Sequence, residues 1–309
     1  MRAVLLGGTG AMGGATAMLL SRAGWDVEVT GRDPSRMPRE LSECGVRFHQ
    51  LERSDTRGVE RLVGNGADLL VDLVAYTAAD VRALLPAMAS VESLVLVSSR
   101  AVYVDDSGRH INGDDPPQFA GPVREDGPTL PPATDDTDPF IREGYAACKV
   151  AAELAALDSG LPVTVIRPSK VHGRWARNAR TTSVVEWMLR GEPTIELADG
   201  DTIDHLTAAA NAAALVETVA GRPGRRILNA ADPDTPTAEE IVGAIAAELS
   251  WEGTIERVAS GSDRGQHPWQ TPMTLDSAAA RELGYEPAGS GISLVAEEVR
   301  WVLPQIAIR

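Results

Sequence analysis

The stretch MRAVLLGGTGAMG, residues 1–13, decides the fold class of this chain. Its apolar run at residues 3–6 stops at a glycine, and apolar and small residues then recur at helical spacing over residues 12–23. The order is therefore a strand, a glycine-rich turn and a helix. A buried strand that leads directly into such a turn and a helix is the opening unit of an α/β protein with a parallel sheet.

Further strands and helices alternate along the first half of the chain. Strands are expected at 26–30, 68–73, 93–98 and 162–166, and helices at 56–64, 78–89 and 143–157. This alternation predicts a Rossmann-type α/β fold, with a doubly wound parallel sheet and right-handed crossovers. From about Gly173 the units are shorter and are punctuated by proline and glycine. We therefore expect a Rossmann domain over 1–172 and a smaller, mainly substrate-binding lobe over 173–309.

Residues 104–139 interrupt this pattern. They contain seven prolines and nine Asp or Glu residues, and their apolar residues follow neither a helical nor a strand period. Loops of this length inside a compact protein are usually functional lids or disordered segments. We favour a lid over an active site and keep a mobile connector as the alternative.

Composition and charge exclude several classes of protein. With 309 residues, 43% of them hydrophobic, the chain can bury a large core. Its 44 acidic and 29 basic residues give a net charge of −15, which repels nucleic acids and anionic membrane surfaces, so we expect neither as a partner. The N-terminus lacks a signal-peptide pattern, and no apolar run approaches the ~20 residues that cross a bilayer, so a cytoplasmic location is expected.

Cysteine and histidine placement predicts no metal site. Cys44 and Cys148 form neither a CxxC pair nor a disulfide framework, and we interpret both as reduced thiols. His205 and His267 have no Cys, His or Glu at ligand spacing. His172 is more simply explained as a packed, hydrogen-bonded histidine than as an acid or base.

The glycine turn predicts where a phosphate group binds. Its glycines, Gly7, Gly10 and Gly13, let the backbone turn tightly and approach a pyrophosphate closely. The helix dipole and the free N–H groups at the start of the helix, including those of Ala11 and Met12, then stabilise its charge. A GxxGxxG pattern is weak by itself. Because it directly follows the first strand, it indicates a dinucleotide site rather than an ordinary turn.

The end of the second strand indicates which dinucleotide binds. An acidic residue about 20 positions after the glycines would accept the ribose 2′-hydroxyl of NAD. Residues 30–32 are instead Thr-Gly-Arg, and Arg32 can pair with the 2′-phosphate of NADP. Asp33 follows directly, and a shift of one residue would restore an acid. We therefore favour NADP and keep NAD as the alternative, and a solvated loop charge is the other interpretation of Arg32.

Tyr145 and Lys149 form a candidate acid/base pair. They lie four residues apart on the expected helix 143–157, and therefore on one face of it. A cation beside a phenol stabilises the phenolate, which makes proton transfer by the tyrosine less costly. Ser98 and Ser99 end an expected strand at the edge where parallel sheets bind ligands. A serine hydroxyl there can hydrogen-bond to a substrate oxygen beside the tyrosine.

Taken in order along most of the chain, these motifs resemble the extended short-chain dehydrogenase/reductases, the NAD-dependent epimerase/dehydratase family. The matching segments are the glycine turn, Ser-Ser-x-x-Val-Tyr at 98–103, Tyr-x-x-x-Lys at 145–149, Ile-Arg-Pro and Val-x-Gly within 166–173, and Glu-Leu-Gly-Tyr-x-Pro at 282–287. The resemblance implies an NAD(P)-dependent enzyme with a small-molecule substrate, and it is compatible with a homodimer.

The resemblance also implies roles for individual residues. Tyr145 would be the general acid/base, Ser99 would orient the reacting oxygen, and Lys149 would activate the tyrosine and bind the nicotinamide ribose. The remaining implied contacts are with the cofactor: Glu52 and Arg53 beside the adenine, Ala75 beside the nicotinamide-side ribose, and Pro168 near the carboxamide.

Two positions depart from the nucleotide-sugar-binding members of this family. Those members usually carry an asparagine where this chain has Lys170, and a diphosphate-binding arginine at about Asp201. A carboxylate facing a diphosphate would repel it, so a nucleotide-sugar substrate is disfavoured unless another arginine substitutes. The nearby arginines would either clamp an anionic substrate or form a solvated helix face: Arg174, Arg177 and Arg180.

Three functions follow from these observations. The first is an NADP-linked reductase of a ketone or aldehyde, or a secondary alcohol dehydrogenase, that acts on a small metabolite. The second is a nucleotide-sugar epimerase or dehydratase that holds its NAD tightly. The third is a catalytically silent cofactor-sensing or RNA-associated protein, which the intact Ser99, Tyr145 and Lys149 and the negative charge disfavour.

Overall fold

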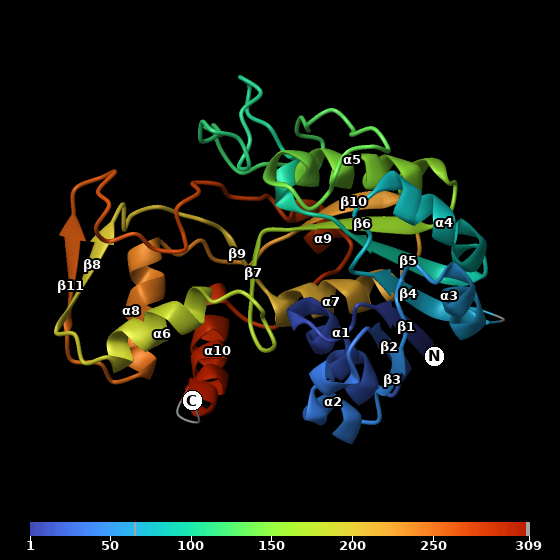
Figure 1. Ribbon diagram of the computed structural model, residues 1–309, viewed down its shortest axis with the longest axis horizontal. Coiled ribbons are helices and arrows are strands. Elements are labelled where there is room, and N and C mark those ends of the chain that lie inside the picture. The colour runs from blue at the N-terminus through green and yellow to red at the C-terminus, as the bar shows by residue number, and fades with distance from the viewer. Residues whose placement is uncertain (65, 307–309) are drawn as a thin grey trace.

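A seven-stranded parallel sheet forms the centre of the molecule (Figure 1). The structure, a computed structural model, describes residues 1–64 and 66–306. The order of strands in the sheet is β10-β6-β5-β4-β1-β2-β3. These strands are β1 (Arg2–Leu6), β2 (Asp26–Gly31), β3 (Arg47–Gln50), β4 (Ala67–Asp72), β5 (Val91–Val97), β6 (Val163–Pro168) and β10 (Arg226–Ala230). The predicted Rossmann-type fold is confirmed.

Helices cover both faces of this sheet and enclose two apolar cores. On one face lie α1 (Ala11–Arg22), α2 (Arg39–Glu43) and α7 (Ala209–Ala220), and on the other α3 (Thr56–Val63), α4 (Ala78–Met88) and α5 (Arg142–Asp158). Within β1, Leu5 packs into the first core and Leu6 into the second, because successive strand side chains point to opposite faces. Burial on both faces explains the continuous apolar run at residues 3–6.

A smaller lobe with its own apolar core lies beside the carboxyl end of the sheet, on the left of Figure 1. It consists of α6 (Arg180–Leu189), β8 (Thr194–Ala198), α8 (Ala238–Glu248), β11 (Thr254–Val258) and α10 (Gly291–Ile306). The short strands β7 (Lys170–His172) and β9 (Leu206–Ala208) join it to the sheet, and α9 (Ala278–Glu282) lies near β10. None of the helices within the described residues is both long enough and apolar enough to span a bilayer.

The C-terminal half of the chain also contributes elements to the Rossmann domain. Helix α7 packs against α1, and β10 pairs in parallel with β6 at the edge of the sheet. The expected division after residue 172 therefore leaves one strand of the central sheet in the C-terminal half. Long-range pairing of this kind leaves no local sign in the sequence.

The segment 104–139 contains no helix or strand, as expected from its composition. Its middle is anchored to the sheet: the Arg167 guanidinium donates to the Glu125 carbonyl (3.1 Å), and the Asn229 side chain donates to the Val123 carbonyl (2.9 Å). The last residue of the segment, Pro139, lines the largest cavity described below. A lid movement would therefore involve the parts on either side of this anchor, and the lid itself stays a prediction.

Candidate functional site

The glycine turn presents an open helix N-terminus. Gly7 has φ of 84°, a left-handed conformation that side chains rarely adopt. A Cβ on Gly13 would lie 2.6 Å from the Cα of Gly8, so the helix and the turn touch through backbone atoms. Gly10 is the N-cap of α1, has no capping side chain, and is followed by a first turn without acidic residues. The N–H groups of that turn are therefore available to an anion.

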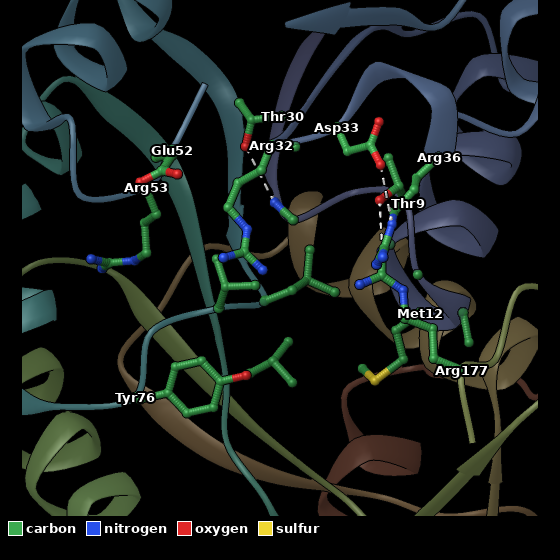
Figure 2. A pocket seen from close by; sticks show the side chains of 18 of the residues that line it. Thr9, Met12, Thr30, Arg32, Asp33, Arg36, Glu52, Arg53, Tyr76 and Arg177 are labelled. Carbon is green, nitrogen blue, oxygen red and sulfur yellow. Dashed lines mark hydrogen bonds and ion pairs between the residues drawn. The ribbon is translucent and has the colours of Figure 1, made fainter. Parts of the chain in front are cut away.

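A cavity of about 1060 Å³ runs from this turn past the ends of β2 and β4 (Figure 2). Its volume lies near the upper end for small-molecule sites, roughly 300–1,000 Å³, which suits an extended dinucleotide. Eight predicted cofactor-binding residues line it: Gly7, Gly10, Ala11, Met12, Gly13, Arg32, Glu52 and Arg53. Within the described chain, the other predicted residues lie outside its wall: Ala75, Ser99, Tyr145, Lys149 and Pro168.

At the end of β2, Asp33 has partners of its own, whereas Arg32 has no acidic partner among the described residues. The Asp33 carboxylate accepts hydrogen bonds from the Ser35 hydroxyl (2.6 Å) and N–H (3.0 Å), and it lies 3.4 Å from the Arg36 guanidinium. The bond from the Ser35 hydroxyl is the main reason that its pKa is lowered. Asp33 is thus the cap of the 3₁₀ turn η1 (Pro34–Arg36). Arg32 lines the cavity and, among the described residues, pairs with no carboxylate.

Glu52 and Arg53 also line the cavity, but Arg53 already has an acidic partner. Its guanidinium lies 2.8 Å from the Asp72 carboxylate at the end of β4 and 3.8 Å from Asp80. The Arg53 side chain is 9% exposed, and that of Asp72 is fully buried. Arg53 therefore neutralises a buried carboxylate, and contact of Glu52 and Arg53 with adenine stays a prediction.

Ser99, Tyr145 and Lys149 come together where β5 ends and α5 begins. Tyr145 lies in the first turns of α5, with Lys149 one turn later. Ser99 is the second residue after β5, and its hydroxyl accepts the Ala101 N–H (3.1 Å) at the start of the 3₁₀ turn η2 (Arg100–Val102). The Lys149 ammonium lies 5.9 Å from the centre of the Tyr145 ring. The three residues are thus neighbours at the ligand-binding edge of the sheet.

Burial controls the protonation of Tyr145. It raises the pKa of the phenol, hydrogen bonding with Ser99 lowers it, and the neighbouring Tyr76 raises it again. The net effect is a pKa above the usual value. This corrects the expectation that Lys149 would lower the pKa of Tyr145 in the free protein.

The Lys149 ammonium interacts with backbone carbonyls instead. It donates to the Ala75 carbonyl (2.6 Å) and to the Val97 carbonyl (3.1 Å), which places the predicted Ala75 beside it. Burial lowers the pKa of Lys149 to about 8, although Asp72 acts in the opposite direction. These contacts fix the ammonium beside the ends of β4 and β5.

Two aromatic residues at this end of the cavity escaped the sequence analysis. Tyr76 and Phe140 both line the cavity, with ring centres 5.2 Å apart. The Tyr76 ring lies 6.3 Å from that of Tyr145, and the Lys149 ammonium lies 4.7 Å from its centre. The signal that could have identified Tyr76 is its place just after β4, at the ligand-binding edge of the sheet.

Lys170 belongs to a buried ion cluster between the sheet and the smaller lobe. Lys170 and Arg100 both pair with the fully buried Asp204, Arg100 at 2.6 Å. Arg180 donates to the Val171 carbonyl (2.7 Å) and lies close enough to oppose protonation of Lys170. Two cations, Arg100 and Lys170, thus pair with one carboxylate, so this cluster of three residues carries a net positive charge.

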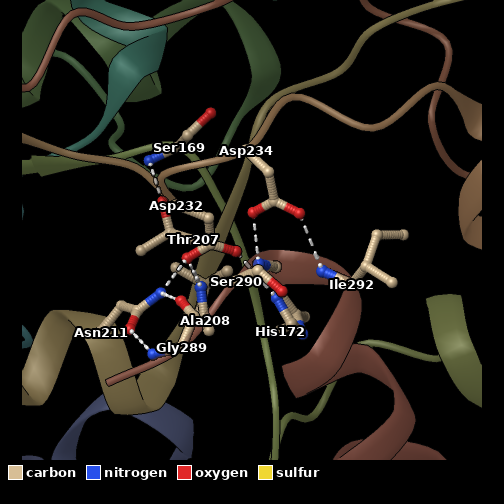
Figure 3. A network of polar contacts seen from close by, with 12 residues as sticks. Ser169, His172, Thr207, Ala208, Asn211, Asp232, Asp234, Gly289, Ser290 and Ile292 are labelled. Atoms are coloured by element: carbon tan, nitrogen blue, oxygen red, sulfur yellow. Dashed lines mark hydrogen bonds and ion pairs between the residues drawn. The ribbon is translucent and has the colours of Figure 1, made fainter. Parts of the chain in front are cut away.

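His172 is buried in a polar network that joins β7 to the smaller lobe (Figure 3). Its imidazole lies 3.2 Å from the Asp232 carboxylate and 3.4 Å from that of Glu298. Asp232 also accepts the Ala208 N–H (2.7 Å) and the Asn211 side chain (2.8 Å). Burial would lower the pKa of His172, but bonds to Asp232 and Glu298 raise it to about 9. The expected packed, hydrogen-bonded histidine is confirmed.

The stability of the protein is expected to fall as the pH rises toward 9. An unfolded histidine has a pKa near 6.5, whereas that of folded His172 is about 9. The resulting stabilisation, on the order of 3 kcal/mol at most, is complete below pH ~6.5 and disappears as the pH passes ~9. Denaturant unfolding across this range measures it. His172→Gln should flatten the profile, and identical profiles for the two proteins would contradict the prediction.

Comparisons with known proteins agree with this geometry. The sequence profile of the NAD dependent epimerase/dehydratase family matches residues 3–231. A search of curated protein sequences found no significant match.

Solved structures of similar fold cover almost the whole chain. A dTDP-glucose 4,6-dehydratase from Bacillus anthracis, in complex with NAD, has a TM-score of 0.73 at 18% identity over 99% of this chain and 98% of its own. A UDP-glucose 4-epimerase from Thermotoga maritima, with UDP-glucose, has a TM-score of 0.73 at 18% identity, over 99% of this chain and 100% of its own. A dTDP-glucose 4,6-dehydratase from Streptomyces venezuelae, with NAD, has a TM-score of 0.72 at 20% identity, over 100% of this chain and 98% of its own. At these identities the likeness shows the fold, whereas the profile match over most of the sequence shows that the chain belongs to the NAD dependent epimerase/dehydratase family.

Proposed function

We propose that the protein is an NADP-linked oxidoreductase that reduces a ketone or aldehyde, or oxidises a secondary alcohol, of a small metabolite. The observation that carries this proposal is that Ser99, Tyr145 and Lys149 lie near one another behind Tyr76, which lines a dinucleotide-sized cavity. The unpaired Arg32 in the wall of that cavity supports NADP over NAD.

The cavity has the chemistry that a dinucleotide requires. The uncapped start of α1 would hold the pyrophosphate, Arg32 would pair with a 2′-phosphate, and Lys149 would bind the nicotinamide-side ribose beside Ala75. Glu52 and Arg53 would flank the adenine, and Pro168, at the end of β6, would lie near the carboxamide. A bound nicotinamide would supply or accept the hydride.

The protein's own residues would handle the proton. In the reducing direction, the Tyr145 hydroxyl would donate its proton to the substrate oxygen while Ser99 donates a hydrogen bond to the same oxygen. The Tyr145 phenol, whose pKa is raised mainly by burial, carries its proton before the reaction. Arg100 is the residue after Ser99, and Lys170 lies two residues after the end of β6. The net positive charge of the cluster of Arg100, Lys170 and Asp204 would therefore favour an anionic substrate.

The choice of cofactor can be tested at Arg32. NADP(H) is expected to bind at least about tenfold more tightly than NAD(H), a difference of about 1.4 kcal/mol. Arg32→Ala should erase this difference by weakening NADP(H) alone, because the guanidinium would contact only the 2′-phosphate. Calorimetry on both cofactors measures the effect, and Asp33→Asn, whose side chain caps η1, is the matched control. Equal affinities in the parent protein would contradict the prediction.

A nucleotide-sugar epimerase or dehydratase is the second candidate. Its support is that proteins of the same fold have been solved with NAD and UDP-glucose. Against it, Lys170 is engaged by Asp204, and Asp201 lines a separate small cavity where a diphosphate-binding arginine was expected. An enzyme of this kind would hold NAD tightly and turn over without added cofactor.

One experiment separates these candidates. The purified protein is denatured, the released nucleotide is identified, and ketones, aldehydes and sugar nucleotides are screened by following NADPH absorbance. Protein free of NAD that consumes NADPH with a carbonyl substrate supports the reductase. Stoichiometric NAD with turnover of a sugar nucleotide supports the epimerase or dehydratase. A protein that binds cofactor but turns over no substrate would support the catalytically silent cofactor sensor.

A further inference from the structure

A short segment between β7 and α6, residues 173–179, lies across the glycine turn. We call it the strap. In Figure 1 it is the yellow-green loop that descends from β7 toward α1. Trp175 presses on α1 so closely that a Cβ on Gly14 would lie 2.4 Å from the indole ring. Trp175 also has a φ of 61°, which is unfavourable for a bulky residue, so this packing must hold the strap in place.

The strap directs Arg177 into the cofactor cavity. The Arg177 guanidinium donates to the Thr9 hydroxyl (3.2 Å) within the glycine turn, as Figure 2 shows. Arg177, Ala176 and Asn178 all line the cavity. Among the described residues Arg177 pairs with no carboxylate, and its positive charge therefore faces the cavity without a counter-ion.

The start of α1, beside the Thr9 partner of Arg177, favours a negatively charged group. Thr9 adjoins the uncapped start of α1, whose first turn carries no acidic residue. Open N–H groups and a guanidinium on two sides of one space are the arrangement that binds a phosphate group. A hydroxyl is a weak partner for a guanidinium, so exchange of the Thr9 contact for a phosphate oxygen would be favourable.

We propose that Arg177 binds the pyrophosphate of the cofactor and thereby fastens the strap over the glycine turn. This inference rests on the proposed NAD(P)-binding function and adds to it a phosphate contact that comes from the C-terminal half of the chain. Cofactor binding then ties the strap, and with it the start of α6, to the Rossmann sheet.

A cofactor offers two kinds of phosphate, and the geometry favours the pyrophosphate. Arg32 already lies at the end of β2, where a 2′-phosphate would bind. Arg177 approaches from the side of Met12 in the first turn of α1, as Figure 2 shows. Thr9, the partner of Arg177, nevertheless lies close to the end of β2, because its methyl group would be 3.6 Å from a Cβ on Gly31. Binding of Arg177 to the 2′-phosphate is therefore the alternative that the test must distinguish.

The test measures the affinities of three probes, NADP, NAD and adenosine 2′-monophosphate, by calorimetry. Arg177→Ala is expected to weaken NADP and NAD equally, each by about tenfold or more, because a charge-assisted hydrogen bond is lost from both. Adenosine 2′-monophosphate, which has no pyrophosphate, should bind as in the parent. Arg32→Ala should instead weaken NADP and adenosine 2′-monophosphate and leave the affinity for NAD unchanged. Arg177→Lys should recover part of the lost affinity.

A matched control and a second readout exclude a merely structural effect. Arg174→Ala changes an exposed arginine of the same strap outside the cavity wall, and it should leave all three affinities unchanged. Hydrogen exchange of residues 173–179 should slow when NAD saturates the parent but not the Arg177→Ala protein.

Three results would overturn the inference. Unchanged affinities in Arg177→Ala would remove Arg177 from the site, and a loss confined to NADP and adenosine 2′-monophosphate would assign it to the 2′-phosphate. A parent protein that binds neither NAD nor NADP would overturn the proposed function itself, and the inference with it.

Discussion

Replacing Tyr145 with phenylalanine is expected to abolish turnover while leaving cofactor affinity nearly intact. The change removes the hydroxyl that would exchange a proton with the substrate but keeps the ring beside Tyr76 and Lys149. A positioned general acid contributes about 10²–10⁴ in rate, so kcat should fall by at least that lower factor. The measurement is kcat together with cofactor Kd, once a substrate is found.

Tyr76→Phe is the matched control, because Tyr76 is a second phenol at the same end of the cavity and closer to the Lys149 ammonium. It should lose far less activity than Tyr145→Phe. If Tyr145→Phe kept more than about a tenth of the parent rate and Tyr76→Phe did not, the proton would pass through Tyr76. His172 is a poorer substitute, because Asp232 and Glu298 already hold its imidazole.

The central sheet was predictable because its strands leave a local sign. Strands buried on both faces appear as unbroken apolar runs, and residues 3–6, 68–73 and 93–98 all lie within or overlap observed strands. Strand β3 (Arg47–Gln50) was missed because it lies at the sheet edge and is mostly polar. The place of β10 beside β6 was missed for another reason, since pairing across the chain depends on tertiary contacts.

The candidate site likewise has a part that the sequence predicts and a part that depends on tertiary contacts. The glycine turn, Arg32, Ser99, Tyr145 and Lys149 could be found because fixed spacings place them at strand ends and on one helix face. Contacts made across the fold left no such pattern: they include the carbonyls that hold Lys149, the Tyr76 ring beside it, and the Arg177 bond to Thr9. Burial, which raises the pKa of Tyr145, is likewise a property of the folded chain.

Ser99→Ala is expected to lower kcat by about 10²–10³, because it removes an oriented hydrogen bond to the reacting oxygen. The same change deletes the bond from the Ala101 N–H to the Ser99 hydroxyl, so a stability loss of about 1 kcal/mol is also expected. Ser99→Thr retains a hydroxyl and should keep much of the activity. Kinetics and denaturant unfolding on the same preparations separate the two effects.

The neighbouring serine provides the control for Ser99→Ala. Ser98 is buried, and its hydroxyl donates to Glu153, which pairs with Arg167 at 2.5 Å. Ser98→Ala should therefore reduce the free energy of unfolding, since it removes a hydrogen bond to a buried carboxylate, while kcat stays close to that of the parent. If Ser98→Ala lost turnover and Ser99→Ala did not, the orienting hydroxyl would belong to Ser98, and the alignment of this segment with the family motif would be off by one residue.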